Sequence, residues 1–399
     1  MFLKKIINSI ADAGKELLNK ALPVQKNLET LLELCDDLIS YKGVASGIAI
    51  AREISEIYLS LSKEDKKKFF IAVDEKFKPN LEAAEKKSLE FIKNKNTNTL
   101  KELSSLAEGK RQEFIRRMNM APNGTAFLVS MREDLLRFVL EDSSLSNLDE
   151  DFRHLFRSWF NPGFLRLERI TWDTKAAVLE RIISYEKVHK IKDMTDLKRR
   201  LDEDRRFYAY FHPVLPDEPL IFVQVAFTQG LASSIQDIIK PMTPNQPKAD
   251  TATFYSISNC QQGLTSVTLG NFLIKRVVYE IQQENPKIKH FGTLSPLPGF
   301  AEWVNYIEEN KLRSILGSED YEKVKFLRST DIKIGDPRII EHKKIIKKLT
   351  IHYLIKEKVN DKPVNAVTRF HLGNAQVLKT LLSMEIFLIM DTTSLLESW

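Results

Sequence analysis

The chain has 399 residues, of which 43% are hydrophobic and 29% are charged. This length and balance exclude a disordered chain, a collagen-like rod and a small disulfide-stapled domain, and they leave room for two domains. The formal net charge of +6 is small, and acidic and basic residues alternate along the chain, so the sequence indicates no nucleic-acid partner.

Cysteines, histidines and apolar runs narrow the class of protein further. Cys35 and Cys260 lie far apart in the sequence, and we expect free thiols in a reducing compartment. The seven histidines form neither an HExxH motif nor a cluster with cysteine, so no metal site is predicted. Residues 1–22 predict an amphipathic helix, and no run of 18 apolar residues predicts a membrane span.

Up to residue 160 the sequence has the pattern of helices. Apolar residues recur three and four positions apart in segments 28–41, 63–77, 80–94 and 131–143. Ser62 and Glu64 mark the start of one helix, and Pro79 follows its end. We therefore predict an all-helical domain over residues 1–160.

A turn signal at Asn161, Pro162 and Gly163 predicts a domain boundary. Leu165 and Leu167 then alternate with charged residues, as in a half-buried strand. Strand and helix patterns alternate from there to about residue 310, and the segment 218–227 is apolar at nearly every position. Residues 161–399 are therefore predicted to form an α/β or α+β domain with a central sheet.

Residues 251–281 predict a strand, a polar turn with Gly263, and a helix that begins near Val267. Such a unit points backbone N–H groups toward an anion at the positive end of the helix dipole, and Gly270 allows a ligand to approach closely. The segment is neither a Walker A loop nor a GxGxxG fingerprint, so nucleotides are not indicated. From the residues alone an ordinary connecting turn is the more frequent explanation. The apolar face of the helix is predicted to consist of Phe272, Leu273, Val277 and Ile281.

Two further segments each present one reactive side chain, and we expect both at the ends of strands. Pro296 forces an extended backbone at Ser295, which presents a hydroxyl to a ligand, although a simple Ser-Pro turn fits as well. His371 lies between Phe370 and Leu372 beside a loop. A partly buried imidazole suits a general acid near neutral pH, whereas a histidine packed in the core is the alternative.

Together these segments resemble the malonyl-CoA decarboxylase family. The similar blocks follow that family's order and spacing from about residue 80 to residue 378. They are GKRQEFIRRMNMAPNGTAFLVSMREDLL (109–136), HPVLPDEPLIFVQVAFTQGL (212–231), FYSISNCQQGL (254–264), LGNFLIKRVV (269–278), LSPLPGF (294–300) and PVNAVTRFHLGN (363–374).

The resemblance implies an α+β fold: an all-helical N-terminal oligomerisation domain, then a GCN5-type N-acetyltransferase-like α/β catalytic domain with a mixed central sheet. It implies conversion of malonyl-CoA to acetyl-CoA and CO2 without a cofactor or a metal, through an enolate that is stabilised and then protonated. It further implies a cytoplasmic homo-oligomer, dimer or tetramer, in fatty-acid and malonate metabolism.

The resemblance also assigns roles to single residues. Ser295 would bind the malonyl carboxylate or the thioester, His371 would donate the proton, and Ser256 would be a supporting hydroxyl. The strand-turn-helix unit would receive the pyrophosphate of CoA. Its residues are Thr265, Ser266, Val267, Thr268, Leu269, Gly270 and Asn271.

Three departures from the family pattern keep two alternatives open. Thr268 stands where the family usually has a carboxylate, and Asn374, Ala375 and Gln376 replace an Asn-Gly-Ala run. Residues 379–399 differ from the longer family C-terminus, which borders the active site. The alternatives are a CoA-dependent acyltransferase and a catalytically impaired CoA-binding protein.

Overall fold

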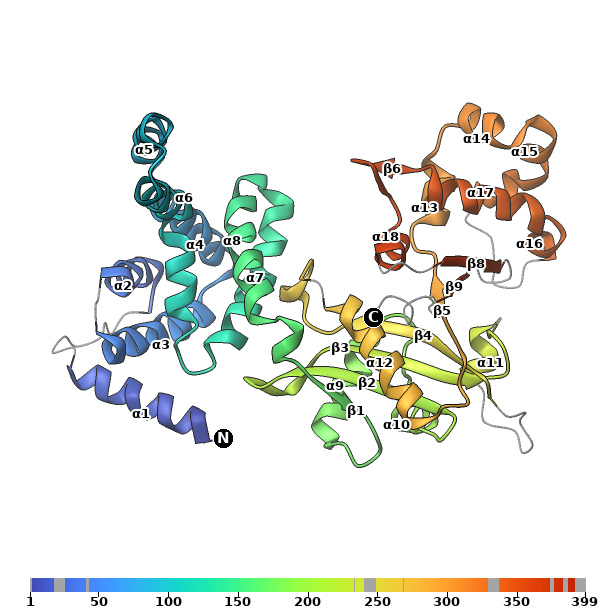
Figure 1. Ribbon diagram of the computed structural model, residues 1–399, viewed down its shortest axis with the longest axis horizontal. Helices are drawn as coiled ribbons and strands as arrows, with labels where there is room; N and C mark the ends of the chain where they lie inside the picture. Colours follow the sequence, from blue (N-terminus) through green and yellow to red (C-terminus); the bar gives the residue numbers. More distant parts are fainter. Residues whose placement is uncertain are drawn as a thin grey trace. The chain divides into compact units, whose positions relative to one another are not determined.

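A computed structural model of the chain describes residues 2–17, 26–40, 43–232, 234–239, 249–267, 269–328, 337–373, 377–382 and 387–391. The chain divides into two compact units (Figure 1). The helical unit comprises residues 1–165, 212–216 and 261–268, and the sheet unit comprises residues 166–211, 217–260 and 269–399. The domain boundary predicted between residues 160 and 161 stays a prediction.

Helices are the only regular elements in the described part of residues 2–160, so the prediction of a helical N-terminal part is confirmed. The polar residues that precede two of the helices act as caps: Ser62 accepts from the Asp65 N–H at 3.1 Å, and Asn80 accepts from the Ala83 N–H at 3.0 Å. The elements are α1 (Phe2–Leu17), α2 (Leu28–Ser40), α3 (Val44–Ser60), α4 (Lys63–Lys76), α5 (Leu81–Asn94), α6 (Thr97–Met118), α7 (Gly124–Glu141), η1 (Ser143–Leu145) and α8 (Ser146–Trp159).

Seven strands of the described residues form one mixed sheet in the order β1-β2-β3-β4-β5-β9-β8. Strands β4 and β5 are parallel, whereas the pairs β1–β2, β3–β4, β5–β9 and β8–β9 are antiparallel. This confirms the α+β class with a mixed central sheet. The strands are β1 (Arg166–Arg169), β2 (Arg205–His212), β3 (Leu215–Thr228), β4 (Thr251–Asn259), β5 (His290–Pro296), β8 (Val377–Leu382) and β9 (Phe387–Asp391).

Helices cover both faces of this sheet. Helices α9 (Ala176–Tyr185) and α10 (Met194–Arg200) pack with Phe207 and Phe222 on one face, and α11 (Ile235–Ile239) packs with Ala226 on the same face. We call it the Glu186 face, after the residue that follows α9. Side chains alternate along a strand, so Tyr210 of β2 points to the other face, where its hydroxyl lies 3.4 Å from a carbonyl of α12 (Gly270–Glu284).

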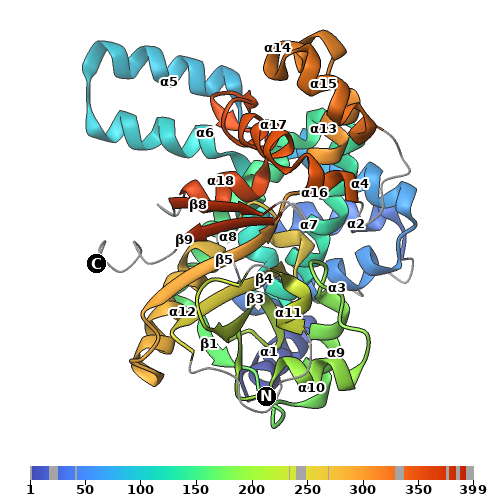
Figure 2. The same cartoon turned by 90° about the vertical axis from the view of Figure 1, so that its right-hand side faces the viewer.

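After β5 the chain forms a cluster of helices with its own apolar core, drawn in orange and red in Figure 1. The cluster consists of α13 (Phe300–Tyr306), α14 (Glu309–Leu316), α15 (Ser318–Val324), η4 (Lys325–Arg328), α16 (Pro337–Glu341) and α17 (Lys343–Ile355). A short hairpin, β6 (Lys358–Val359) and β7 (Lys362–Pro363), then leads to α18 (Ala366–Gly373). Figure 2 shows β8 and β9 continuing the sheet beyond β5, as the strand pairing requires.

Three details differ from the sequence-based expectations. The helix expected from Val267 begins at Gly270, after a short η3 turn (Gln262–Leu264). Phe272, expected on its apolar face, is 52% exposed, because the buried stripe runs through Leu273, Ile274, Val277, Val278 and Ile281 at helical spacing and Phe272 lies beside it. His371 lies on α18 and not at the end of a strand.

No helix in the described parts of the chain is long and apolar enough to cross a membrane.

Candidate active site

Ser295 and His371 form a buried hydrogen-bonded pair. Ser295 is the next-to-last residue of β5. Pro296 restricts the backbone of Ser295 to an extended conformation, and this sets the direction of the serine side chain. Its Oγ lies 2.8 Å from Nε2 of His371, and the two residues are 8% and 1% exposed. A hydroxyl both donates and accepts, so either atom of the pair can hold the shared proton, depending on the histidine tautomer. The sequence separates these groups by 76 positions.

Asn365 positions the helix that carries His371. Its Oδ1 accepts from the Thr368 backbone N–H at 2.8 Å and from the Thr368 hydroxyl at 3.1 Å. This is an N-cap bond, and it fixes the first turn of α18. The other end of the same amide donates from Nδ2 to the Pro298 carbonyl at 2.8 Å. One buried side chain therefore ties the start of α18 to the loop that follows Ser295.

The loop after Ser295 is held from a second direction as well. The Tyr353 hydroxyl of α17 donates to the same Pro298 carbonyl at 3.1 Å. Gly299 follows with a φ of +79°, a left-handed conformation that favours glycine, and a Cβ there would lie 2.8 Å from the Tyr353 hydroxyl. Both the positive φ and the close contact with Tyr353 therefore require glycine at this position of the LSPLPGF block.

Strands β4 and β5 separate directly before Ser295. Their parallel pairing runs from Thr251 with His290 to Phe254 with Thr293 and ends there. Beyond this point β5 pairs with β9, while β4 continues along β3. Tyr255 is an extra residue in β4, because Gln224 of β3 pairs with Ser256 and the next residue, Val225, pairs with Phe254. We call the opening between the two strands the β4–β5 fork.

The sequence predicted an anion site at the start of α12, and this stays a prediction. Leu269 precedes the helix, no side chain among the described residues caps it, and the first turn carries no acidic residue. The first N–H groups of a helix have no partner within the helix, so this end favours a negative group. Gly270 is buried: a Cβ there would lie 2.7 Å from the Phe370 ring of α18 and 3.3 Å from Ile221 of β3. The start of α12 and the helix of His371 therefore touch.

Backbone hydrogen bonds close the turn before α12. The N–H of Thr265 donates to the Gln262 carbonyl at 3.0 Å, and the N–H of Val267 donates to the Leu264 carbonyl at 3.0 Å. These two backbone groups donate within the turn, so the first N–H groups of α12 are the candidate anion donors of this segment. Ser266 between them has a φ of +65°, a left-handed conformation that is not part of a helix.

Arg132 of α7 holds this turn within the helical unit. It is 1% exposed, and its Nη1 donates to the Gly263 carbonyl at 2.6 Å and to the Thr265 carbonyl at 2.9 Å. Its Nε donates to Asp149 at 2.8 Å, which compensates the buried charge. A Cβ on Gly263 would lie 1.9 Å from the Val129 carbonyl, so only glycine fits against α7 there.

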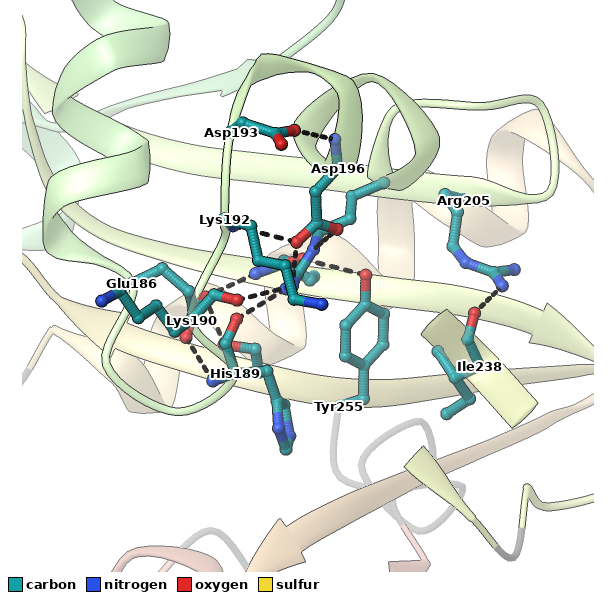
Figure 3. A network of polar contacts seen from close by, with 12 residues as sticks. Glu186, His189, Lys190, Lys192, Asp193, Asp196, Arg205, Ile238 and Tyr255 are labelled. Atoms are coloured by element: carbon teal, nitrogen blue, oxygen red, sulfur yellow. Dashed lines mark hydrogen bonds and ion pairs between the residues drawn. The ribbon is translucent and has the colours of Figure 1, made fainter. Parts of the chain in front are cut away.

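Glu186 is buried, and its carboxylate takes part in the polar network that Figure 3 shows. Its carboxylate accepts from the Ser256 hydroxyl at 2.7 Å, from the Ser258 hydroxyl at 3.2 Å and from the Gln224 amide. The backbone N–H groups of residues 188 and 189 donate to it as well, at 2.7 and 2.9 Å. Figure 3 also shows the Tyr255 ring beside this network, and burial raises the pKa of that tyrosine.

The structure brings Ser295 to His371 but does not bring Ser256 to either of them. Leu294 belongs to an apolar cluster with Ala226 on the Glu186 face. Its neighbour Ser295 therefore points to the opposite face, which we call the Ser295 face. Ser256 pairs with Gln224 and donates to Glu186, so its hydroxyl lies on the Glu186 face. The assignment of Ser256 to substrate binding stays a prediction.

Some predicted positions lie outside the described residues. Thr268, residues 374–376 and residues 392–399 are among them, and the side chain of Asn271 is not described. Among the described residues no three His, Cys, Asp or Glu side chains gather where they could hold a metal ion.

Sequence reasoning missed Arg132, Glu186 and Asn365. Arg132 lies in the MREDLL stretch of a block that resembles the family, and Asn365 stands three residues before Thr368, as a helix cap does. Those two signals were available. Glu186 had none, because the side chains that donate to it come from positions 38 to 72 residues away.

Comparison with known proteins agrees with the resemblance. Two family models match the chain: the malonyl-CoA decarboxylase N-terminal domain over residues 77–160, and the malonyl-CoA decarboxylase C-terminal domain over residues 163–386. The mitochondrial malonyl-CoA decarboxylase of Anser anser anser is 35% identical over 282 residues, which cover 64% of this chain and 56% of that protein. The chain thus spans little more than half the length of this relative.

Solved structures of bacterial proteins match over most of the chain. The crystal structure of malonyl-CoA decarboxylase from Rhodopseudomonas palustris has a TM-score of 0.83 and 37% identity, and covers 93% of this chain and 97% of that one. The crystal structure of malonyl-CoA decarboxylase from Agrobacterium vitis has a TM-score of 0.80 and 39% identity, with 90% and 92% covered. The chain therefore belongs to the malonyl-CoA decarboxylase family.

Proposed function

We propose that the chain converts malonyl-CoA to acetyl-CoA and CO2. The observation that carries this proposal is the buried contact of 2.8 Å between Ser295 Oγ and His371 Nε2, in a chain of the malonyl-CoA decarboxylase family. The names of the relatives support malonyl-CoA as the substrate.

The reaction sets two chemical demands. The bond between the carboxylate carbon and the methylene carbon breaks, CO2 leaves, and the bonding electron pair becomes the enolate of acetyl-CoA. The enolate oxygen then needs fixed hydrogen-bond donors, each worth about 2.7 to 4 kcal/mol when aligned. The carbon needs one proton, delivered by an acid within hydrogen-bond reach.

The Ser295–His371 pair can meet the second demand. When Nε2 carries the proton, Ser295 Oγ accepts from it, and the hydroxyl hydrogen is free to point to the substrate. His371 then supplies the proton that reaches the methylene carbon, either directly or through the serine hydroxyl. The histidine regains its proton from water, so the sum is malonyl-CoA plus one proton giving acetyl-CoA plus CO2.

The binding of CoA is proposed at the segment Thr265 to Asn271. The uncapped start of α12 supports this, because the first backbone N–H groups of the helix favour a phosphate group.

We further propose that the reaction needs neither a cofactor nor a metal, because the thioester itself delocalises the electron pair. Assembly as a homo-oligomer, dimer or tetramer, and action in the cytoplasm in fatty-acid metabolism follow from the family resemblance. Light scattering of the purified full chain tests the assembly, and activity after dialysis against a chelator tests the independence from metals.

The decisive experiment incubates the purified full chain with malonyl-CoA alone and measures acetyl-CoA and CO2. We expect both products in equal amounts. Product that forms only when an amine is added would favour the acyltransferase alternative. Calorimetric binding of malonyl-CoA without any turnover would favour the impaired CoA-binding alternative.

A further inference from the structure

The Thr293 hydroxyl is buried without a hydrogen-bond partner in the part of the chain that the structure describes. The residue is 1% exposed. Buried polar side chains are nearly always hydrogen-bonded, so an exception calls for an explanation, and an absent ligand is one of them. Other buried threonines of the sheet unit have hydroxyl partners in the same structure. They are Thr251, Thr253, Thr350 and Thr368.

Thr293 shares its strand face with Ser295. The two residues are separated by Leu294, which points to the Glu186 face, so both hydroxyls lie on the Ser295 face. Residues two apart in a strand are about 6.6 Å apart. A three-carbon acyl group with an oxygen at each end can therefore lie along the strand and reach both hydroxyls.

Thr293 also marks the closed end of the β4–β5 fork. It is the last residue of β5 that pairs with β4, and Ser295 lies on the open side of the fork. The start of α12, proposed to bind the CoA phosphates, lies at the carboxyl end of β4: Gly270 packs against Ile221, and Ile221 pairs with Asn259. An acyl-CoA that enters from this end places the far atoms of its acyl group deepest, toward Thr293.

We propose that the Thr293 hydroxyl donates a hydrogen bond to the malonyl carboxylate and selects acyl groups that end in a carboxylate. This inference rests on the proposed function, since it places malonyl-CoA in the β4–β5 fork. A neutral hydroxyl holds the carboxylate in position. A full positive charge at the same place would stabilise the carboxylate of the bound substrate and so raise the barrier to its departure as CO2.

Two matched substitutions test the inference. Thr293→Val keeps the shape and removes the hydroxyl, whereas Thr293→Ser keeps the hydroxyl and removes a methyl group. We expect Thr293→Val to lower kcat/KM for malonyl-CoA by about 10- to 100-fold, the range of a charge-assisted hydrogen bond. The inhibition constant of acetyl-CoA, which lacks the carboxylate, should change less than about twofold, and Thr293→Ser should stay within about threefold of the parent chain.

Thermal unfolding completes the test, because removing an unpartnered hydroxyl should leave Tm unchanged or higher. A Thr293→Val chain with a raised Tm and unchanged kcat/KM would overturn the proposal, since the hydroxyl would then be idle. Equal weakening of acetyl-CoA and malonyl-CoA would overturn it as well, and so would a strongly lowered Tm. If the parent chain does not decarboxylate malonyl-CoA, the proposed function fails, and calorimetry with malonyl-CoA and acetyl-CoA still decides whether Thr293 recognises the carboxylate.

Discussion

The two faces of the sheet treat buried polar groups in opposite ways. On the Glu186 face, one carboxylate accepts five hydrogen bonds, from three side chains and two backbone N–H groups. On the Ser295 face, the Ser295 hydroxyl has His371 as partner, and the more deeply buried Thr293 hydroxyl has none among the described residues.

This difference separates scaffold from site. A buried polar group without a partner costs about 1 to 3 kcal/mol, so a fold tolerates one where a ligand completes it. The five donors around Glu186 leave no place for a ligand on its carboxylate, which marks that network as support for β3 and β4. The Ser295 face keeps unused hydrogen-bonding capacity where the two central strands separate.

The largest expected effect is on the Ser295 face. His371→Ala should lower turnover of malonyl-CoA by about 10²- to 10⁴-fold, because the proton donor is lost, while affinity for CoA stays nearly intact. Steady-state kinetics and calorimetry with CoA measure the two quantities. His154→Ala, at an exposed position of α8, is the matched control. Weakened CoA binding with unchanged turnover at saturation would remove His371 from the chemistry.

The Glu186 face should respond in stability. Glu186→Gln replaces an acceptor of five bonds by an amide that cannot accept them all, so we expect the free energy of unfolding to fall by about 2 to 4 kcal/mol. Urea denaturation measures the loss, with the exposed Glu180→Gln of α9 as control. The kcat of the folded variant should stay within about threefold, since no reacting group is removed. Intact stability with lost turnover would contradict the division between the faces.

A smaller effect is expected for Asn365, whose side-chain amide has hydrogen-bond partners at both ends and positions the helix that carries His371. Asn365→Asp keeps the acceptor that caps α18 and loses the donor to the Pro298 carbonyl. We expect kcat to fall about 10-fold with KM within about threefold, because the spacing of Ser295 and His371 is disturbed and not the binding of CoA. Asn360→Asp, in an exposed turn, is the control. A changed KM with unchanged kcat would show that Asn365 does not act through this pair.

The smallest effect concerns an ion pair between β2 and α12. Arg206 holds the pKa of Glu284 below the usual value of 4.5. The unfolded chain therefore binds this proton at higher pH than the folded chain, and the stability that the pair contributes is lost as pH falls through and below 4.5. Glu284→Gln should lower Tm at neutral pH, and the difference from the parent chain should shrink toward pH 3. A difference that is independent of pH would contradict the ion pair as its cause, and the exposed Glu302→Gln serves as control.

Much of the fold was accessible from local sequence patterns. The spacing of apolar residues predicted the helices before residue 160, and Ser62 marked a cap that the structure contains. The resemblance pointed to Ser295 and His371, and their side chains do meet, although their catalytic roles stay predictions. The start of α12 was predicted three residues too early, because the polar turn before the helix carries no local signal for the first helical residue.

The sequence by itself determined the elements, because periodicity, caps and proline act within a few residues of one another. Only the tertiary structure decided which buried polar groups have partners, because those partners come from distant positions: Glu186 meets a serine 70 residues away, and Ser295 meets an imidazole 76 residues away. Thr253 and Thr293 are both strand threonines in the sequence. Folding places the Thr228 hydroxyl, 25 positions away, 3.1 Å from that of Thr253, whereas the Thr293 hydroxyl has no partner among the described residues.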